Sequence, residues 1–180
     1  LKELIFGVMD VAVIGEAETI INNLILTKRN GLDLFGVKGI IFRNCLDQVV
    51  QTDPEQFWTD LDKIPFPARD LIKNELYSRP DNGEPQATIQ TSRGCPSQCI
   101  FCLSPIVSGT KLRERSVENI IAEIEECVDK YNIKNFFFRA DTFTINKKTV
   151  IEICKRIISR KIEIKWVANS RVNTLDEERL

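Results

Sequence analysis

Three cysteines lie within eight residues near the middle of the chain, in the segment Arg93-Gly-Cys-Pro-Ser-Gln-Cys-Ile-Phe-Cys102. The spacing Cys-x-x-x-Cys-x-x-Cys puts Cys95, Cys99 and Cys102 on one short loop. Soft thiolate ligands select zinc, copper(I) or iron–sulfur centres. A four-iron cluster usually takes four cysteines, so three would leave one iron open for a substrate, as a catalytic site requires. The alternatives are a zinc loop or an electron-transfer cluster with a fourth ligand elsewhere.

The other three cysteines have ordinary structural explanations. Cys127 and Cys154 fall on the apolar faces of predicted helices, where a thiol packs as a small hydrophobic group. Cys45 falls in a predicted hairpin, where we expect it to be incidental. A secreted disulfide framework would spread its cysteines over a small fold, so tight clustering favours a metal or cluster in a reducing compartment. The sequence has no histidine, which excludes Cys/His zinc patterns within it.

The composition is that of a globular protein, with 43% hydrophobic residues, 28% charged residues and a formal net charge of -1. Nucleic-acid binding normally requires basic clustering, which this balance does not favour, so we expect no nucleic-acid partner. No apolar run approaches the roughly 18 residues of a membrane span. The chain begins at Leu1 and its only methionine is Met9, so we expect an internal piece of a longer protein.

A strand, a helix and a hairpin, followed by a proline-rich segment, are predicted before the cysteine loop. Residues 10–15 predict a strand, residues 16–29 predict a helix, and two strands at 38–43 and 48–51 predict a hairpin. Residues 52–85 hold five prolines, which block long regular elements, although a short helix is expected over 68–76. We therefore expect a first domain over 1–51, a proline-rich linker over 52–85 and a second domain over 86–180.

From Gln86 onward, strands and helices alternate. The apolar patterns predict strands over 87–91, 134–139 and 163–168 and helices over 116–131 and 146–160, with a third helix beginning at Thr174. Ser116 and Asn146 are the expected N-caps of the first two helices. Repeated strand–helix units imply a parallel sheet. In barrels of this kind the working residues lie at the carboxyl ends of the strands. Those ends are residues 92–95, 140–142 and 169–171, and the cysteine loop is at the first.

The cysteine loop in this setting resembles the signature of the radical S-adenosylmethionine (SAM) superfamily. The resemblance implies a partial barrel of six strand–helix units and a [4Fe-4S] cluster on Cys95, Cys99 and Cys102. It implies that SAM chelates the open iron and is reductively cleaved to methionine and a 5′-deoxyadenosyl radical. It further implies a small-molecule substrate, an anaerobic, cytoplasmic setting and a one-electron reductant such as flavodoxin or ferredoxin.

In the superfamily the second strand ends in a glycine-rich turn that binds the SAM amino group. This chain has Arg139-Ala-Asp-Thr-Phe-Thr144 there, without glycine. The position still makes Ala140, Asp141 and Thr142 candidate SAM contacts, with the Asp141 carboxylate facing the ammonium group. The alternative is that Asp141 caps the following turn.

Further SAM contacts are expected from the third strand end and from the cysteine loop. Arg171, beside Ser170, suits the SAM carboxylate, although a surface ion pair with Asp176 or Glu177 is the alternative. Phe101 can shield the cluster or contact the bound base. Arg113 and Arg115, before the first helix, indicate a solvated charge run, with a substrate contact as the alternative.

The front of the chain resembles the branch of the superfamily that joins a cobalamin-binding domain to the barrel. The resemblance rests on the turn Gly15-Glu16-Ala17-Glu18, the hairpin and the peptide Ile64-Pro-Phe-Pro-Ala-Arg-Asp-Leu71. It implies that Gly15 allows close approach of cobalamin and that Glu16 hydrogen-bonds to it. The alternative is a strand–helix turn with acidic residues at the helix start.

The expected fold class is therefore α/β. The end of a Rossmann-like cobalamin-binding domain is followed by the first three strand–helix units of a partial (βα)6 TIM-like barrel. The implied chemistry is methyl transfer, cyclisation or rearrangement at an unactivated carbon.

Two other functions would also account for a cysteine loop of this kind. A methylthiotransferase-like radical SAM enzyme resembles the chain around Arg113-Glu-Arg-Ser116, but such enzymes carry three further cluster cysteines in a front domain. Here only Cys45 precedes the loop. A non-catalytic iron–sulfur or zinc module would have a fourth thiolate at the site and would not cleave SAM.

Overall fold

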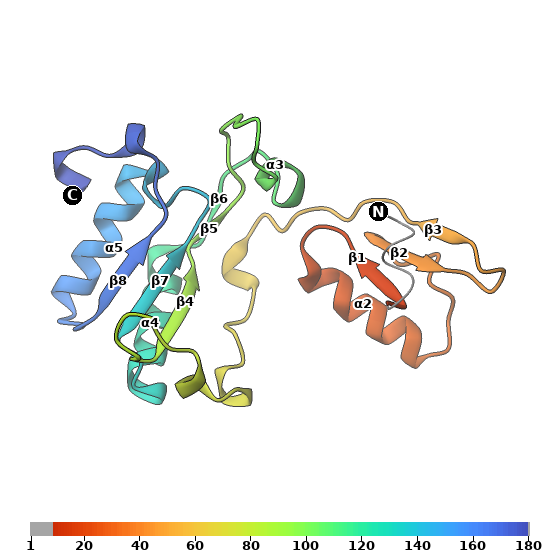
Figure 1. Cartoon of the computed structure of the whole chain (residues 1–180), viewed down its shortest axis with the longest axis horizontal. Coiled ribbons are helices and arrows are strands. Elements are labelled where there is room, and N and C mark those ends of the chain that lie inside the picture. The colour runs from red at the N-terminus through yellow and green to blue at the C-terminus, as the bar shows by residue number, and fades with distance from the viewer. Residues whose placement is uncertain (1–8, 180) are drawn as a thin grey trace. The chain divides into compact units, whose positions relative to one another are not determined.

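The computed structural model describes residues 9–179, which divide into two compact units (Figure 1). Unit 1 extends to Thr59 and also contains Gln98–Thr110, whereas unit 2 contains Asp60–Ser97 and the chain from Lys111 onward. The predicted linker is therefore shared, because its first residues join unit 1 and Asp60–Pro85 joins unit 2. No helix among the described residues is long and apolar enough to cross a membrane.

Unit 1 is a three-stranded sheet with one long helix beside it (Figure 1). The elements are β1 (Val11–Val13), α2 (Ala17–Arg29), β2 (Ile40–Arg43) and β3 (Val49–Gln51). The predicted strand, helix and hairpin are confirmed. Both pairings, β1 with β2 and β2 with β3, are antiparallel. The described strands of unit 1 contain no parallel pair of the kind a Rossmann-like sheet requires, so that part of the expected fold stays a prediction.

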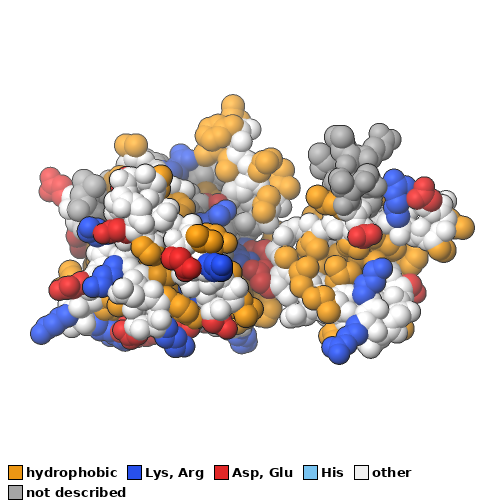
Figure 2. Space-filling view, turned by 60° about the horizontal axis from the view of Figure 1, so that its bottom comes forward, with side chains coloured by type: hydrophobic (Ala, Val, Ile, Leu, Met, Phe, Trp, Pro, Cys, Tyr) orange, Lys and Arg blue, Asp and Glu red, His pale blue; other side chains and the backbone are white. Residues whose placement is uncertain are grey.

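The core of unit 1 forms where one face of α2 meets the sheet. Ile20 of α2 is buried against Ile40 and Phe42 of β2, together with Leu34 and Val37 of the preceding loop. The other apolar residues of the helix are spaced around it, so a second group remains exposed: Ile21, Ile25 and Leu26. Figure 2 shows the resulting gathering of hydrophobic side chains on the side of unit 1 that carries α2.

Unit 2 contains the predicted parallel sheet. Its strands lie in the order β4 (Gln86–Gln90), β7 (Asn135–Arg139) and β8 (Lys165–Ala168), and both pairings are parallel. The crossovers are α4 (Val117–Tyr131) and α5 (Lys147–Ser159). The expected helix from Thr174 is not formed within the described residues, where the chain makes the 3-10 turns η5 (Val172–Thr174) and η6 (Glu177–Arg179).

In unit 2 the apolar faces of both helices pack on the sheet, but Ile158 of α5, which the apolar pattern places inward, is exposed. Phe136 and Phe138 of β7 and Ile89 of β4 are fully buried, and α4 and α5 pack against them in a single cluster (Figure 1). The predicted N-caps are also confirmed. The Ser116 side chain accepts a hydrogen bond from the Asn119 N–H, and the Asn146 side chain accepts one from the Lys148 N–H. Local sequence therefore sets where both helices begin.

The prediction of a helix over residues 68–76 is wrong. The segment forms the 3-10 turns η2 (Arg69–Leu71) and η3 (Asn74–Leu76), after η1 (Leu61–Lys63). The Arg69 carbonyl accepts hydrogen bonds from the Ile72 N–H and, at 2.8 Å, from the Asn74 side chain. These partners replace the i→i+4 bond that would continue an α-helix.

Candidate functional site

The cysteine loop leaves and re-enters unit 2 through a short antiparallel ladder. Ser92–Arg93 (β5) pairs with Arg113–Glu114 (β6), so that Arg93 lies opposite Arg113. One step further, the Arg115 N–H donates to the Thr91 carbonyl at 3.0 Å. Residues 91–93 and 113–115 are called the neck below. The neck fixes where the loop begins, two residues before Cys95.

The first cysteine lies immediately beyond the neck. Gly94 adopts φ +82°, a left-handed conformation that side-chain-bearing residues rarely adopt. The turn is followed directly by Cys95, whose side chain is buried. Gly94 therefore supplies the left-handed turn that leads from the neck into Cys95.

The two later cysteines belong to the part of the loop in unit 1. Cys99 is half-buried and Cys102 is exposed. The Cys102 N–H donates to the Cys99 carbonyl at 3.1 Å, and the Cys102 Sγ accepts from the Ser104 N–H at 3.4 Å, where α3 (Ser104–Val107) begins. Backbone N–H groups directed at cysteine sulfur are one means by which proteins tune iron–sulfur clusters.

Hydrophobic side chains of the same segment face solvent. Ile100, Phe101, Leu103 and Ile106 are all exposed, and Phe101 retains 87% of its accessible surface. Phe101 is therefore available to a bound molecule, as expected of a residue that covers a cluster or contacts a base.

The donor chemistry of the loop fits an iron–sulfur group. None of the six cysteines, all of which lie in the described part of the chain, forms a disulfide. Within residues 9–179, no three His, Cys, Asp or Glu side chains converge as a metal-ion site would require. Cys95 belongs to unit 2, whereas the other two cysteines of the loop belong to unit 1. The fit rests on the donor set, which is thiolate-only and uses the soft ligands that iron–sulfur clusters take.

The turn at Gly15 and the end of the cysteine loop share one aromatic neighbour in unit 1. A Cβ on Gly15 would lie 3.8 Å from Cε1 of Phe57, whereas a Cβ on Gly109 would lie 3.0 Å from Cε2 on the other edge of the ring. Both glycines have positive φ. The Glu16 carboxylate accepts a hydrogen bond from the Trp58 N–H at 3.2 Å. The turn is therefore held by residues 57–58 and, through Phe57, contacts the loop.

The second strand end offers one exposed candidate. Ala140 and Thr142 are buried, whereas Asp141 is exposed. The following turn, η4 (Phe143–Ile145), has no side-chain hydrogen bond at its cap residue Thr142. Of these three predicted SAM contacts, only Asp141 presents a side chain to solvent.

The third strand end is linked to the second by hydroxyl groups. The Thr144 Oγ1 is hydrogen-bonded to the Ser170 Oγ and, at 2.6 Å, to the Thr174 Oγ1. Arg171 is half-buried, and its Nε donates to the Asn173 Oδ1 at 3.3 Å. The structure therefore gathers Ser170 and Arg171 beside the end of β7, where the Ser170 hydroxyl already has a protein partner.

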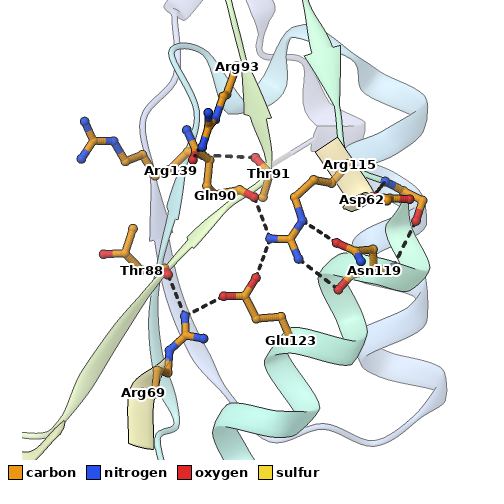
Figure 3. Close-up of polar contacts among 11 residues, drawn as sticks. Asp62, Arg69, Thr88, Gln90, Thr91, Arg93, Arg115, Asn119, Glu123 and Arg139 are labelled. Carbon is orange, nitrogen blue, oxygen red and sulfur yellow. Dashed lines mark hydrogen bonds and ion pairs between the residues drawn. The ribbon is translucent and has the colours of Figure 1, made fainter. Parts of the chain in front are cut away.

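The arginines before α4 are not a solvated charge run, and this expectation is wrong. Arg113 and Arg115 are buried. Arg115 forms an ion pair with Glu123, whose second oxygen pairs with Arg69 of the linker (Figure 3). The roles of Arg69 and Glu123 were not predicted from the sequence. The available signal was the position of Glu123, three residues after Ile120 within the apolar stripe of α4.

The cysteines outside the loop behave as predicted core thiols where they are buried. Cys127 is fully buried, and burial raises the pKa of its thiol to about 11. Cys154 is half-buried, and burial also raises its pKa. A raised pKa favours the neutral thiol of a packed core residue over the thiolate form that metals bind. Cys45 is exposed, as a hairpin residue can be.

Comparison with known proteins gives consistent findings. The family model described as the Radical SAM superfamily matches residues 89–180. A protein named an uncharacterized methyltransferase of Pyrococcus horikoshii is 36% identical over 170 residues, which is 94% of this chain and 36% of the relative. The anaerobic magnesium-protoporphyrin IX monomethyl ester cyclase of Cereibacter sphaeroides is 31% identical over 178 residues, covering 95% of this chain and 28% of the cyclase.

Among solved structures, the chain resembles the radical S-adenosylmethionine methyltransferase TsrM of Kitasatospora setae, solved with cobalamin and a [4Fe-4S] cluster bound. The TM-score is 0.74 at 19% identity, over 94% of this chain and 35% of TsrM. This likeness supports a shared fold. The chain spans about a third of the length of the proteins it matches.

Proposed function

The chain belongs to the radical SAM superfamily, and on that premise we propose that Cys95, Cys99 and Cys102 hold a [4Fe-4S] cluster with one iron left for SAM. The observation that carries the proposal is the thiol triplet beyond the end of the first parallel strand, on a loop whose two ends are paired at the neck. Three thiolates leave the open iron that a catalytic cluster needs.

When bound, the cluster supplies one electron to SAM, which is cleaved to methionine and a 5′-deoxyadenosyl radical. The protein contributes binding, orientation and exclusion of side reactions. We assign the SAM ammonium to the exposed Asp141 carboxylate and the SAM carboxylate to Arg171, with Ala140, Thr142 and Ser170 shaping the strand ends. Exposed Phe101 would cover the bound group on the loop side.

We further propose that the front of the chain is the end of a cobalamin-binding domain. Residues 1–51 would form its last part, residues 52–85 the linker and residues 86–180 the first half of a partial barrel. Gly15 allows close backbone approach, and Glu16 would contact the cofactor while it accepts from the Trp58 N–H. The cobalamin bound in the TsrM structure supports this assignment.

The proposed reaction of the whole protein is cobalamin-dependent methyl transfer or cyclisation at an unactivated carbon of a small molecule. A one-electron donor such as flavodoxin or ferredoxin would reduce the cluster. Reduced iron–sulfur groups and free thiols favour the cytoplasm and anaerobic conditions.

Anaerobic reconstitution of the full-length protein tests the proposal. We expect about four irons per chain at this site, a change in the electron paramagnetic resonance (EPR) spectrum on adding SAM, and release of 5′-deoxyadenosine. Cys99→Ala should abolish all three, whereas Cys45→Ala, a matched change at an exposed cysteine, should abolish none.

Each rival function gives a distinct result. Retained SAM cleavage in Cys99→Ala would refute the ligand assignment. A cluster with four thiolates and no response to SAM would indicate an electron-transfer module. About eight irons per chain would indicate a methylthiotransferase-like enzyme with a second cluster.

A further inference from the structure

Three charged side chains of unit 2, those of Arg69, Arg115 and Glu123, are buried together at the neck (Figure 3). Glu123 of α4 is only 1% exposed, and its two carboxylate oxygens contact different arginines. The Arg69 Nη2 lies 2.6 Å from Oε1, and the Arg115 Nη1 lies 2.5 Å from Oε2. Removing three charges from water is costly, so a buried ion pair is weak evidence for a role in stability alone. A role in fixing geometry accounts better for this arrangement.

Both arginines also bind the strand that leads to Cys95. The Arg69 Nη2 donates to the Thr88 carbonyl at 3.1 Å, and the Arg115 Nη1 donates to the Gln90 carbonyl at 2.9 Å. These carbonyls belong to alternate residues of β4. The backbone N–H of Arg115 completes the neck by donating to the Thr91 carbonyl. A single residue, Arg115, therefore joins both sides of the neck, and Glu123 orients its guanidinium group.

The same network brings the linker to the neck. Asp62 accepts a hydrogen bond from the Ser116 N–H at 2.8 Å, and the Arg115 guanidinium lies 5.4 Å from the centre of the Phe66 ring. With the Arg69–Glu123 pair, the linker contacts residues 115–123 at three points. Residues 60–85 of the linker are thus packed as part of unit 2, against β4 and against the residues that follow the cysteine loop.

We infer that Arg69, Glu123 and Arg115 are positioning residues, which set the separation and direction of the two ends of the cysteine loop and tie that geometry to the linker. The inference rests on the proposed cluster site at Cys95, Cys99 and Cys102. Outer residues that orient metal ligands commonly alter metal affinity by about 10- to 100-fold when they are changed.

The test uses the full-length protein, reconstituted anaerobically, with Glu123→Gln as the perturbing variant. Gln keeps the shape of the side chain but removes the charge that holds both guanidinium groups. The matched control is Glu125→Gln, two residues along α4, where the carboxylate pairs with Arg160 at the surface. Three quantities are measured: the rate of iron release to a chelator, the SAM-induced change in the EPR spectrum, and hydrogen exchange of neck peptides in the cluster-free protein.

We expect Glu123→Gln to release iron about tenfold faster or more, to show an altered EPR response to SAM, and to exchange faster at residues 91–93 and 113–115. Glu125→Gln should match the wild type in all three. Wild-type values for Glu123→Gln would overturn the inference. A wild-type protein without a SAM-responsive cluster would instead refute the proposed function.

A second variant separates positioning from stability. Arg69, Glu123 and Arg115 are called the triad. The variant Arg69→Met/Glu123→Leu/Arg115→Met makes all three residues apolar, a kind of replacement that is often neutral or stabilising. It removes the bonds to the Thr88 and Gln90 carbonyls while leaving the interior filled. We expect a thermal midpoint near that of the wild type together with the fast iron release of Glu123→Gln. If iron release and the EPR response return to wild-type values along with stability, the triad is structural only and the inference is wrong.

Discussion

Gly109→Ala tests how firmly the outer part of the cysteine loop is held in unit 1. Gly109 has φ +78°, and a Cβ there would lie 3.0 Å and 3.2 Å from Cε2 and Cδ2 of the Phe57 ring. The left-handed backbone costs a non-glycine residue about 1–2 kcal/mol. Overpacking against the ring adds about 1–3 kcal/mol. The free energy of unfolding should therefore fall by about 2–5 kcal/mol.

Gly31→Ala supplies the control for the backbone contribution. Gly31 has φ +66°, and nothing lies within 4 Å of the Cβ position. We expect this variant to lose only the backbone contribution of about 1–2 kcal/mol. The difference between the two alanine variants then measures the contact with Phe57.

Urea unfolding of the cluster-free full-length protein measures both values, with the slope of the transition checked for constancy. A double-mutant cycle with Phe57→Ala should recover about 1–3 kcal/mol of the Gly109→Ala cost, because the obstructing ring is gone. An equal cost for Gly109→Ala and Gly31→Ala, or no coupling to Phe57, would refute the packing argument.

Glu123→Gln should lower the free energy of unfolding by about 3–5 kcal/mol because it leaves two buried guanidinium groups without their carboxylate. The control Glu125→Gln should lower it by at most about 1 kcal/mol. Similar losses for the two variants in urea unfolding would contradict the buried pairing. Burial raises the pKa of the Cys127 thiol to about 11, so the folded protein holds this proton where the unfolded chain releases it. The free energy of unfolding should fall as the pH rises toward 11, and iodoacetamide at pH 8 should label Cys45 but not Cys127, as mass spectrometry can verify. Ser116→Ala should cost about 1 kcal/mol by removing the N-cap of α4, and an unchanged thermal midpoint would argue against the cap.

Different parts of the cysteine loop pack in the two units. Its ends are paired with each other in unit 2, and its outer part packs with the Gly15 turn through Phe57 in unit 1. Within each unit, the part of the loop that is held in place loses less conformational entropy when it binds a cofactor. This preorganisation is the physical contribution that the chain makes to the proposed chemistry.

The sequence by itself determined the local elements and the type of chemistry. The period of apolar residues located α4, α5 and the three parallel strands, and Ser116 and Asn146 marked the helix starts, because these signals depend on neighbours a few residues away. The spacing of the cysteines indicated an iron–sulfur site for the same reason. Local pattern failed over 68–76, where a side-chain bond to the Arg69 carbonyl replaced the expected helix.

Only the tertiary structure decided which charges are buried. Arg115 follows a run of charged residues that looks solvated in sequence, yet it is enclosed by Glu123 and Phe66. Glu123 and its partner Arg69 are 54 residues apart. No periodicity encodes such a pair, because a buried carboxylate is tolerated only where distant segments bring cations and carbonyls to it. That dependence on chain segments far apart is why the neck and its triad became visible only in three dimensions.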